Sequence, residues 1–347
     1  MGVRGLAGQG GGLLKTLAVR LAQVAATVVV TWFVADRAGL TLAELRAVDF
    51  GIWSPDWPLF GLSCAVLFAG YVLSSHLWGR IVHGLGGRRL GAGRSVPLYM
   101  IANLGRYVPG KIWQIAALAT LARQNGIAAS TATAAAVLLQ GMALGAAALV
   151  GAGTLWTLAE GAPWRWVVPA AVLSVALLGL TPPVFGFLSS SWFRLSRTPD
   201  PPSLAPGDAV GWMVLALVNW AVYAGAFWMM VRGLGVEAGL LTAASAFAAA
   251  YVAGYVAIFA PAGIGVREAS LVAFLSPQLG PGTAGAVALV ARVWTTAVEV
   301  VPASIFWGRY LAHPVQDSEA GPSGTSTPGQ AEEPSGREGR EGVGDRV

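Results

Sequence analysis

The segment NLGRYVPGKIWQIA, residues 103–116, interrupts an apolar stretch of the chain with two glycines, a proline and two cations. A second segment, APAGIGVREA at residues 260–269, interrupts another apolar stretch in a similar way. Proline removes a helical hydrogen bond and glycine weakens a helix, so each break predicts two short helices joined by irregular backbone. Irregular backbone at membrane depth is tolerated only where protein or water covers it. The breaks therefore predict the interior of a membrane protein.

The composition of the chain is typical of a membrane protein. Of its 347 residues, 55% are hydrophobic and 11% are charged, whereas a soluble domain carries about 25% charged residues. Apolar runs of about 20 residues match the roughly 30 Å hydrocarbon core of a bilayer. We therefore expect an all-α fold, a polytopic transmembrane helical bundle. Full spans are predicted at residues 21–35, 57–79, 131–158, 166–188, 210–231 and 284–307.

The first span could instead be a cleaved signal peptide, because a run of 15 apolar residues is near the upper limit of such a segment. We favour a retained helix, because residues 13–18 extend the helical pattern and Trp32 and Phe33 are typical of an interfacial anchor.

Three regions follow from the composition. They are a disordered N-terminus at residues 1–12, a transmembrane domain at 13–311 and a disordered acidic tail at 312–347.

The densest basic loop, residues 80–94, follows the span at 57–79. By the positive-inside rule this loop is cytoplasmic. His76, Arg80 and His83 share a helical face beside it, and we interpret them as an interfacial anchor.

The two interrupted stretches, residues 96–123 and 240–275, are too broken for ordinary spans and are predicted to be re-entrant. Counting crossings from the basic loop then places both termini in the cytoplasm. On this count a span, a broken segment and another span follow one another twice in the chain. Each segment of the second set runs through the membrane in the opposite direction to its counterpart in the first set. That order predicts an inverted repeat, the plan of many transporters. If residues 240–275 make a full crossing, the symmetry is lost.

Several function classes are disfavoured by the composition. Cys64 is the single cysteine and the three histidines are scattered, so we expect no disulfide framework, metal site or cofactor. The basic residues lie in loops without interleaved aromatics, which argues against nucleic acid as a partner. The excess of 20 Arg over 2 Lys, with 46 Gly, indicates a high-GC bacterial source and hence a bacterial cell membrane.

Charged side chains within the apolar stretches are the candidate binding residues, because burying a cation costs about 2.5 to 3.5 kcal/mol on insertion scales. They comprise four cations and two carboxylates, which leaves two positive charges in excess. Such an excess suits a phosphate group, to which Arg offers paired donors. The predicted binding residues are Asn103, Arg106, Lys111, Gln114, Arg267, Glu268, Arg292 and Glu299, and the predicted structural breaks are Gly105, Pro109, Gly110, Pro261, Gly263 and Gly265.

Plainer interpretations of these side chains stay open. Arg106 and Lys111 could extend to the cytoplasmic interface and anchor the segment. Glu268 could cap the helix that follows the second break. Arg292 could pair with Glu268 or with Glu299, which lies seven residues later on the same helical face.

The two breaks resemble the most characteristic motifs of the lysylphosphatidylglycerol synthase transmembrane-domain family. These are NLGRYVPGKIW at residues 103–113 and APAGIGVREA at 260–269, where Ala262 replaces a frequent second glycine. The likeness covers roughly residues 13–311. It implies a polytopic domain that translocates or handles phospholipids or polyprenyl-linked lipids. In some relatives a fused soluble C-terminal domain carries the synthase activity, so with only residues 312–347 following we do not expect aminoacyl transfer here.

The sequence thus predicts a flippase-like protein, rather than an enzyme, that moves an anionic phospholipid or lipid-linked phosphate between leaflets. Arg106, Lys111 and Arg267 would engage the phosphate, while Glu268 and Glu299 would balance the charge. One alternative is an integral membrane enzyme acting on polyprenyl phosphates, although only two carboxylates are available to it. Another is a non-catalytic membrane scaffold for envelope assembly.

Overall fold

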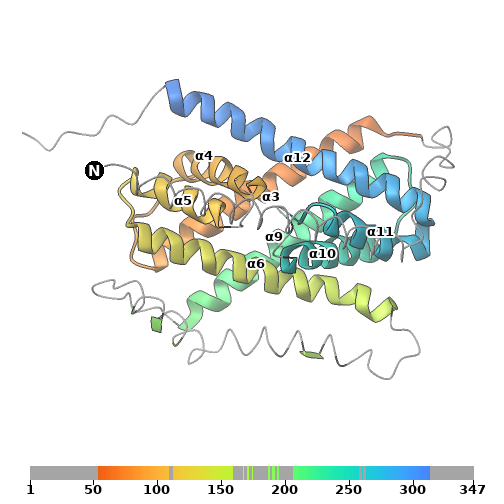
Figure 1. The fold of residues 1–347 in the computed structure, drawn as a ribbon, viewed down its shortest axis with the longest axis horizontal. Coiled ribbons are helices and arrows are strands. Elements are labelled where there is room, and N and C mark those ends of the chain that lie inside the picture. Colours follow the sequence, from red (N-terminus) through yellow and green to blue (C-terminus); the bar gives the residue numbers. More distant parts are fainter. Residues whose placement is uncertain are drawn as a thin grey trace, which may run out of the picture.

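The computed structural model describes residues 54–108, 112–158, 206–257, 260 and 263–312, with isolated positions between 167 and 194. Every regular element within these residues is helical, which confirms the all-α prediction. In chain order (Figure 1) they are α3 (Trp57–Gly84), α4 (Ala92–Asn103), the 3₁₀ turn η2 (Leu104–Tyr107), α5 (Trp113–Arg123), α6 (Ala129–Leu158), α9 (Pro206–Gly233), α10 (Leu240–Val256), α11 (Val266–Leu279) and α12 (Pro281–Ala312). The predicted span at 21–35, most of that at 166–188 and both predicted disordered termini lie outside the described residues.

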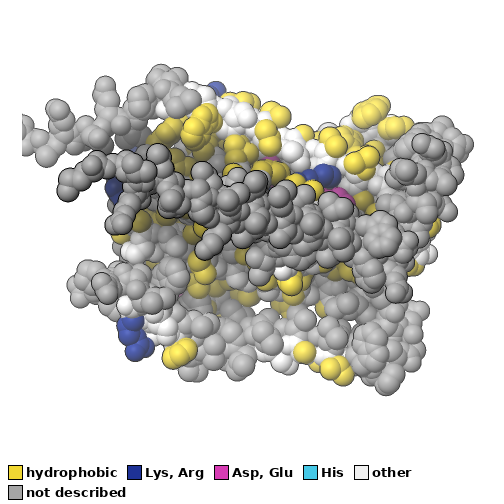
Figure 2. Space-filling model, viewed as in Figure 1, with side chains coloured by type: hydrophobic (Ala, Val, Ile, Leu, Met, Phe, Trp, Pro, Cys, Tyr) yellow, Lys and Arg dark blue, Asp and Glu magenta, His cyan; other side chains and the backbone are white. Residues whose placement is uncertain are grey.

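Within the described residues, four helices are long and apolar enough to cross a bilayer, namely α3, α6, α9 and α12. The shortest two, α3 and α9, have 28 residues each. At 1.5 Å per residue they extend about 42 Å, which exceeds the roughly 30 Å hydrocarbon core. On the described part of the face in Figure 2, hydrophobic side chains cover more of the surface than charged ones. The four helices match four of the predicted spans, so the chain is a multi-pass membrane protein.

Short helices flank both breaks, as the sequence predicts. At the second break Gly263 and Gly265 have φ of +68° and +84°, a left-handed backbone that glycine adopts without steric cost. A Cβ on Gly263 would lie 2.9 Å from the Cα of Gly254 in α10, so the chain doubles back at close range here. Three predicted break residues, Pro109, Gly110 and Pro261, lie outside the described residues, as does the predicted binding residue Lys111.

The described helices form two sets with the same order. The helices α3, α4, α5 and α6 have 28, 12, 11 and 30 residues, and α9, α10, α11 and α12 have 28, 17, 14 and 32. Helices α3 and α9 are antiparallel, because Gly70 faces Tyr223 whereas Phe60 lies against Gly233. Figure 1 shows α4 and α5 at one end of the bundle and α10 and α11 at the other, with the long helices running across both. This is the arrangement expected of an inverted repeat.

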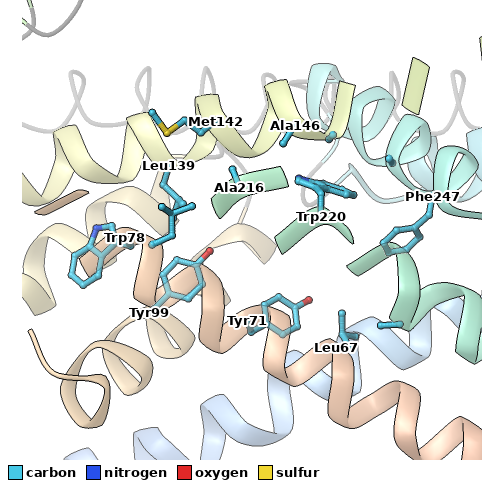
Figure 3. Packing of buried hydrophobic residues seen from close by; sticks show 14 of the residues in the cluster. Leu67, Tyr71, Trp78, Tyr99, Leu139, Met142, Ala146, Ala216, Trp220 and Phe247 are labelled. Atoms are coloured by element: carbon cyan, nitrogen blue, oxygen red, sulfur yellow. The ribbon is translucent and has the colours of Figure 1, made fainter. Parts of the chain in front are cut away.

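Aromatic rings of α9 and α10 cluster inside the bundle, and Tyr71 of α3 joins them, with its ring centroid 5.6 Å from that of Tyr223. The Trp220 ring centroid lies 5.7 Å from that of Tyr223, 6.4 Å from Phe247 and 4.9 Å from Tyr251. Figure 3 shows Trp220 and Phe247 together with Tyr71, beneath α6. These large rings leave little free volume at the bundle centre, which limits the space between the two breaks.

Candidate functional site

Glu299 of α12 is the centre of a buried hydrogen-bond cluster. Its side chain is 3% exposed. The Oε1 atom accepts from Tyr71 Oη at 2.5 Å, from Asn103 Nδ2 at 3.3 Å and from Arg106, which forms an ion pair with it. The Oε2 atom accepts from Tyr107 Oη at 2.5 Å. The cluster therefore ties α12 to α3 and to the end of the helix that precedes the first break.

Arg106 has a partner that the sequence does not identify. The sequence predicts Arg106 as a phosphate-binding cation and considers Arg292 as a partner for Glu299. In the structure the Arg106 guanidinium lies on the Glu299 carboxylate. Neither Tyr71 nor Tyr107 was predicted as a site residue. The available signal was Glu299 itself, since a carboxylate within a span requires several donors around it.

A second ion pair joins α12 to the second break. Arg292 Nη1 lies 3.5 Å from Glu268 Oε1, one of the two pairings that the sequence left open. The other oxygen of Glu268 accepts from the Gly265 backbone N–H at 2.6 Å and so caps α11, as also anticipated. The Arg292 guanidinium lies 5.7 Å from the ring centroid of Tyr107. Tyr107 therefore contacts members of both ion pairs.

Amide side chains continue the Glu299 cluster across the first break. Gln114 Nε2 donates to Asn103 Oδ1 at 2.8 Å, and Gln140 Nε2 donates to Gln114 Oε1 at 3.3 Å. The predicted site residues Asn103 and Gln114 are thus joined by a hydrogen bond. Gln140 was missed, although a glutamine in the middle of an apolar span is itself a signal of a polar interior.

Arg267, at the start of α11, has no carboxylate at ion-pair distance among the described residues. Its guanidinium carbon lies 4.8 Å from the ring centroid of Phe247 and 6.0 Å from that of Tyr251. Such cation–π contacts stabilise a cation only partly, by roughly 0.5 to 2 kcal/mol. Arg267 therefore retains capacity to bind an anion.

Two small cavities lie where the two breaks approach each other, and we call them the central cavities. Each has a volume of about 60 Å³. That is room for about four water molecules at roughly 15 Å³ each, and too little for a lipid headgroup. The residues common to both linings are Arg106, Gln114, Gln140, Tyr251 and Arg267.

Two buried polar atoms of residues that line one central cavity have no hydrogen-bond partner in the described residues. They are Asn219 Oδ1 and Trp220 Nε1. Buried polar atoms in native proteins nearly always have a partner, so a polar occupant is expected beside them. The predicted residues Asn103, Arg106, Gln114 and Arg267 therefore surround a polar space.

Comparison with known proteins agrees with this architecture. No curated protein matches the chain at a significant level. The family model of the lysylphosphatidylglycerol synthase TM region, however, matches residues 17–303, a range that includes both breaks and both ion pairs. Because this match covers most of the chain, the protein belongs to the lysylphosphatidylglycerol synthase TM region family.

Proposed function

We propose that this protein moves a phosphate-bearing lipid across the membrane, with the phosphate passing through the central cavities. One observation carries the proposal, namely Arg267. It is a partly buried cation beside a polar space, and no described carboxylate pairs with it. A phosphate group would supply the missing negative charge and accept hydrogen bonds from the guanidinium.

The charge balance of the described site supports an anionic ligand. Arg106 pairs with Glu299 and Arg292 pairs with Glu268. The two positive charges in excess then reside on Arg267 and on Lys111, which lies outside the described residues. We propose that these two cations bind the phosphate, while the paired residues hold the breaks in place.

The geometry also suggests how the lipid would pass. We propose that α4 with α5 and α10 with α11 are re-entrant pairs that approach from opposite leaflets. Their placement at opposite ends of the bundle (Figure 1), with both breaks lining the same cavities, supports this topology. Since the central cavities are too small for a headgroup, transport would require one helix set to move against the other.

We further propose transport without covalent chemistry, in a bacterial plasma membrane with both termini in the cytoplasm. Glu299 is occupied by four donors, and Glu268 caps α11 and pairs with Arg292. An enzyme acting on polyprenyl phosphates would need carboxylates available for a metal or for proton transfer. The two carboxylates here serve as structural partners instead.

The test is the translocation of a labelled phosphatidylglycerol in vesicles that contain the purified protein, measured with a leaflet reporter. Arg267→Ala is expected to slow translocation by about tenfold or more, because a charge-assisted bond to phosphate is lost. Arg267→Lys should retain part of the rate, because the charge remains but the paired donors do not.

The matched control is Arg232→Ala. Arg232 pairs with Glu237, whose side chain is 88% exposed, and exposed pairs contribute little to stability. Wild-type translocation by Arg267→Ala would contradict the proposal. Metal-dependent turnover of a lipid phosphate would favour the enzyme instead. A wild-type protein that moves no lipid but retains a stable protein partner would favour the scaffold.

A further inference from the structure

A larger cavity lies beside the C-terminal part of α3 and the start of α9, and we call it the vestibule. Its volume is about 620 Å³, against about 60 Å³ for each central cavity. Ligand pockets usually have about 300 to 1,000 Å³, so the vestibule has the size of a binding site. Its polar lining includes His76, Arg80, His83, Arg89, Ser95 and Asp208.

The charged side chains of this lining are two arginines and one aspartate. Arg80 and Arg89 are exposed, and neither belongs to an ion pair with any carboxylate in the described part of the chain. Asp208 is the carboxylate of this lining, and it is not free, because it takes part in an interaction in the structure. A shallow hollow lined by Arg88 and Arg94 adjoins the vestibule through Arg89. The local field therefore attracts anions.

A buried hydroxyl on the same wall gives independent support for a ligand. Ser95 is 1% exposed and lines the vestibule, yet its Oγ has no hydrogen-bond partner among the described residues. Leaving such a hydroxyl without a partner is unfavourable unless a ligand bonds to it. Ser95 lies in the first turn of α4, whose N-cap residue Gly91 supplies no side-chain cap. A helix N-terminus favours negative charge.

We propose that the vestibule captures the phosphate group of a membrane lipid before the lipid reaches the central cavities. This inference rests on the proposed function and adds the surface at which the lipid first binds. Arg80 and Arg89 contact the phosphate oxygens, and the Ser95 hydroxyl donates to one of them. Trp212 and Leu215 of α9 provide apolar contact for the glycerol and the start of the acyl chains.

The position of the vestibule fits this role. The vestibule is lined by residues between 76 and 84 of α3 and between 207 and 215 of α9, whereas the central cavity beside Trp220 is lined by residues between 67 and 77 of α3 and between 216 and 223 of α9. The two spaces therefore lie at successive levels of the same α3–α9 pair. A lipid held in the vestibule would have its headgroup beside the route to Arg267.

The experiment measures how short-chain phosphatidylglycerol raises the unfolding temperature of the purified full-length protein in detergent. A ligand that binds the folded state stabilises it in proportion to ln(1 + [L]/Kd), so the titration gives an apparent Kd. Arg80→Gln with Arg89→Gln is expected to weaken binding at least about tenfold, because two charge-assisted contacts are lost. Arg123→Gln with Arg309→Gln, two exposed arginines outside the vestibule, should bind like wild type. Equal affinity of the two double variants would overturn the inference.

Ser95→Ala provides a second measurement that does not change the net charge. Because the hydroxyl has no described protein partner, its removal should leave the lipid-free unfolding temperature unchanged or higher. Binding of phosphatidylglycerol should nevertheless weaken about fivefold, because one hydrogen bond to the ligand is lost. An unchanged apparent Kd would show that Ser95 does not contact the lipid, and it would count against the vestibule as the phosphate-binding site.

Glycerol 3-phosphate separates a lipid from a soluble source of phosphate. Stabilisation by glycerol 3-phosphate at the same concentrations as the lipid would show that the site takes a soluble phosphate, and the lipid part of the inference would be wrong.

Translocation assays then separate this inference from the proposed function. Lipid binding that needs Arg80 and Arg89, in a protein that moves no lipid, would support the vestibule and overturn transport. If the Arg80→Gln, Arg89→Gln variant binds and transports lipid like wild type, the vestibule is wrong and the transport function stands.

Discussion

Glu299→Gln is expected to lower the unfolding free energy by about 3 kcal/mol and to abolish lipid transport. The substitution keeps the shape of the side chain but leaves the Arg106 guanidinium without its counter-charge. It also weakens the hydrogen bonds from Tyr71 and Tyr107, because each now meets an amide instead of a carboxylate. The estimate lies at the lower end of values for broken buried pairs, since the Arg106 side chain is 24% exposed. Thermal unfolding in detergent and the leaflet reporter measure the two effects.

The double variant Arg106→Gln with Glu299→Gln separates the ion pair from the rest of the cluster. Removing both charges leaves no unpaired ion, so this variant should unfold at a higher temperature than Glu299→Gln alone. Tyr71→Phe, which removes one donor to the same carboxylate, should cost only about 1 to 2 kcal/mol. If Glu299→Gln unfolds like wild type, the cluster does not hold the first break.

Gly263→Ala is expected to destabilise the second break by about 2 to 5 kcal/mol. Two costs combine, because Gly263 has φ of +68° and a Cβ there would lie 2.9 Å from Gly254 Cα. A left-handed backbone costs a residue with a side chain roughly 1 to 2 kcal/mol, and forced overpacking adds about 1 to 3. Arg267 packs against Gly254, so displacement of the turn should also slow translocation.

Gly126→Ala is the matched control for Gly263→Ala. Gly126, in the turn after α5, has φ of +77°, close to that of Gly263, but a Cβ there meets nothing within 4 Å. It should therefore show the backbone cost alone, with near-normal translocation. The difference in unfolding temperature between the two variants measures the close approach of the chain to Gly254. Equal unfolding temperatures and equal transport would show that this approach carries no functional constraint.

Helix α12 has a central place in the site because it holds both breaks by opposite charges. Its Glu299 binds Arg106 of the first break, and its Arg292 binds Glu268 of the second. Seven residues separate Arg292 and Glu299, so both lie on one face about 10 Å apart along the axis. A shift of α12 would therefore strain both ion pairs together, which offers a physical means of coupling the two breaks.

The sequence by itself determined the membrane class, the four described spans and the position of both breaks. Each of these follows from local composition. Apolar runs of about 20 residues must cross lipid, and Pro or Gly within them must interrupt the helix, whatever the rest of the chain does. The capping role of Glu268 was also local, since it lies three residues from the Gly265 N–H that it accepts.

Only the tertiary structure decided which charges remain unpaired. Arg106 and Glu299 are separated by 193 residues in the chain, and Gln114 meets Gln140 across two helices. The sequence count of two excess cations could not say which side chains carried that excess. Ion pairing depends on which helix faces meet, and that is set by close packing such as Gly70 against Tyr223 between α3 and α9. Helix formation is dictated by neighbours in the chain, whereas charge compensation inside a membrane is dictated by neighbours in space.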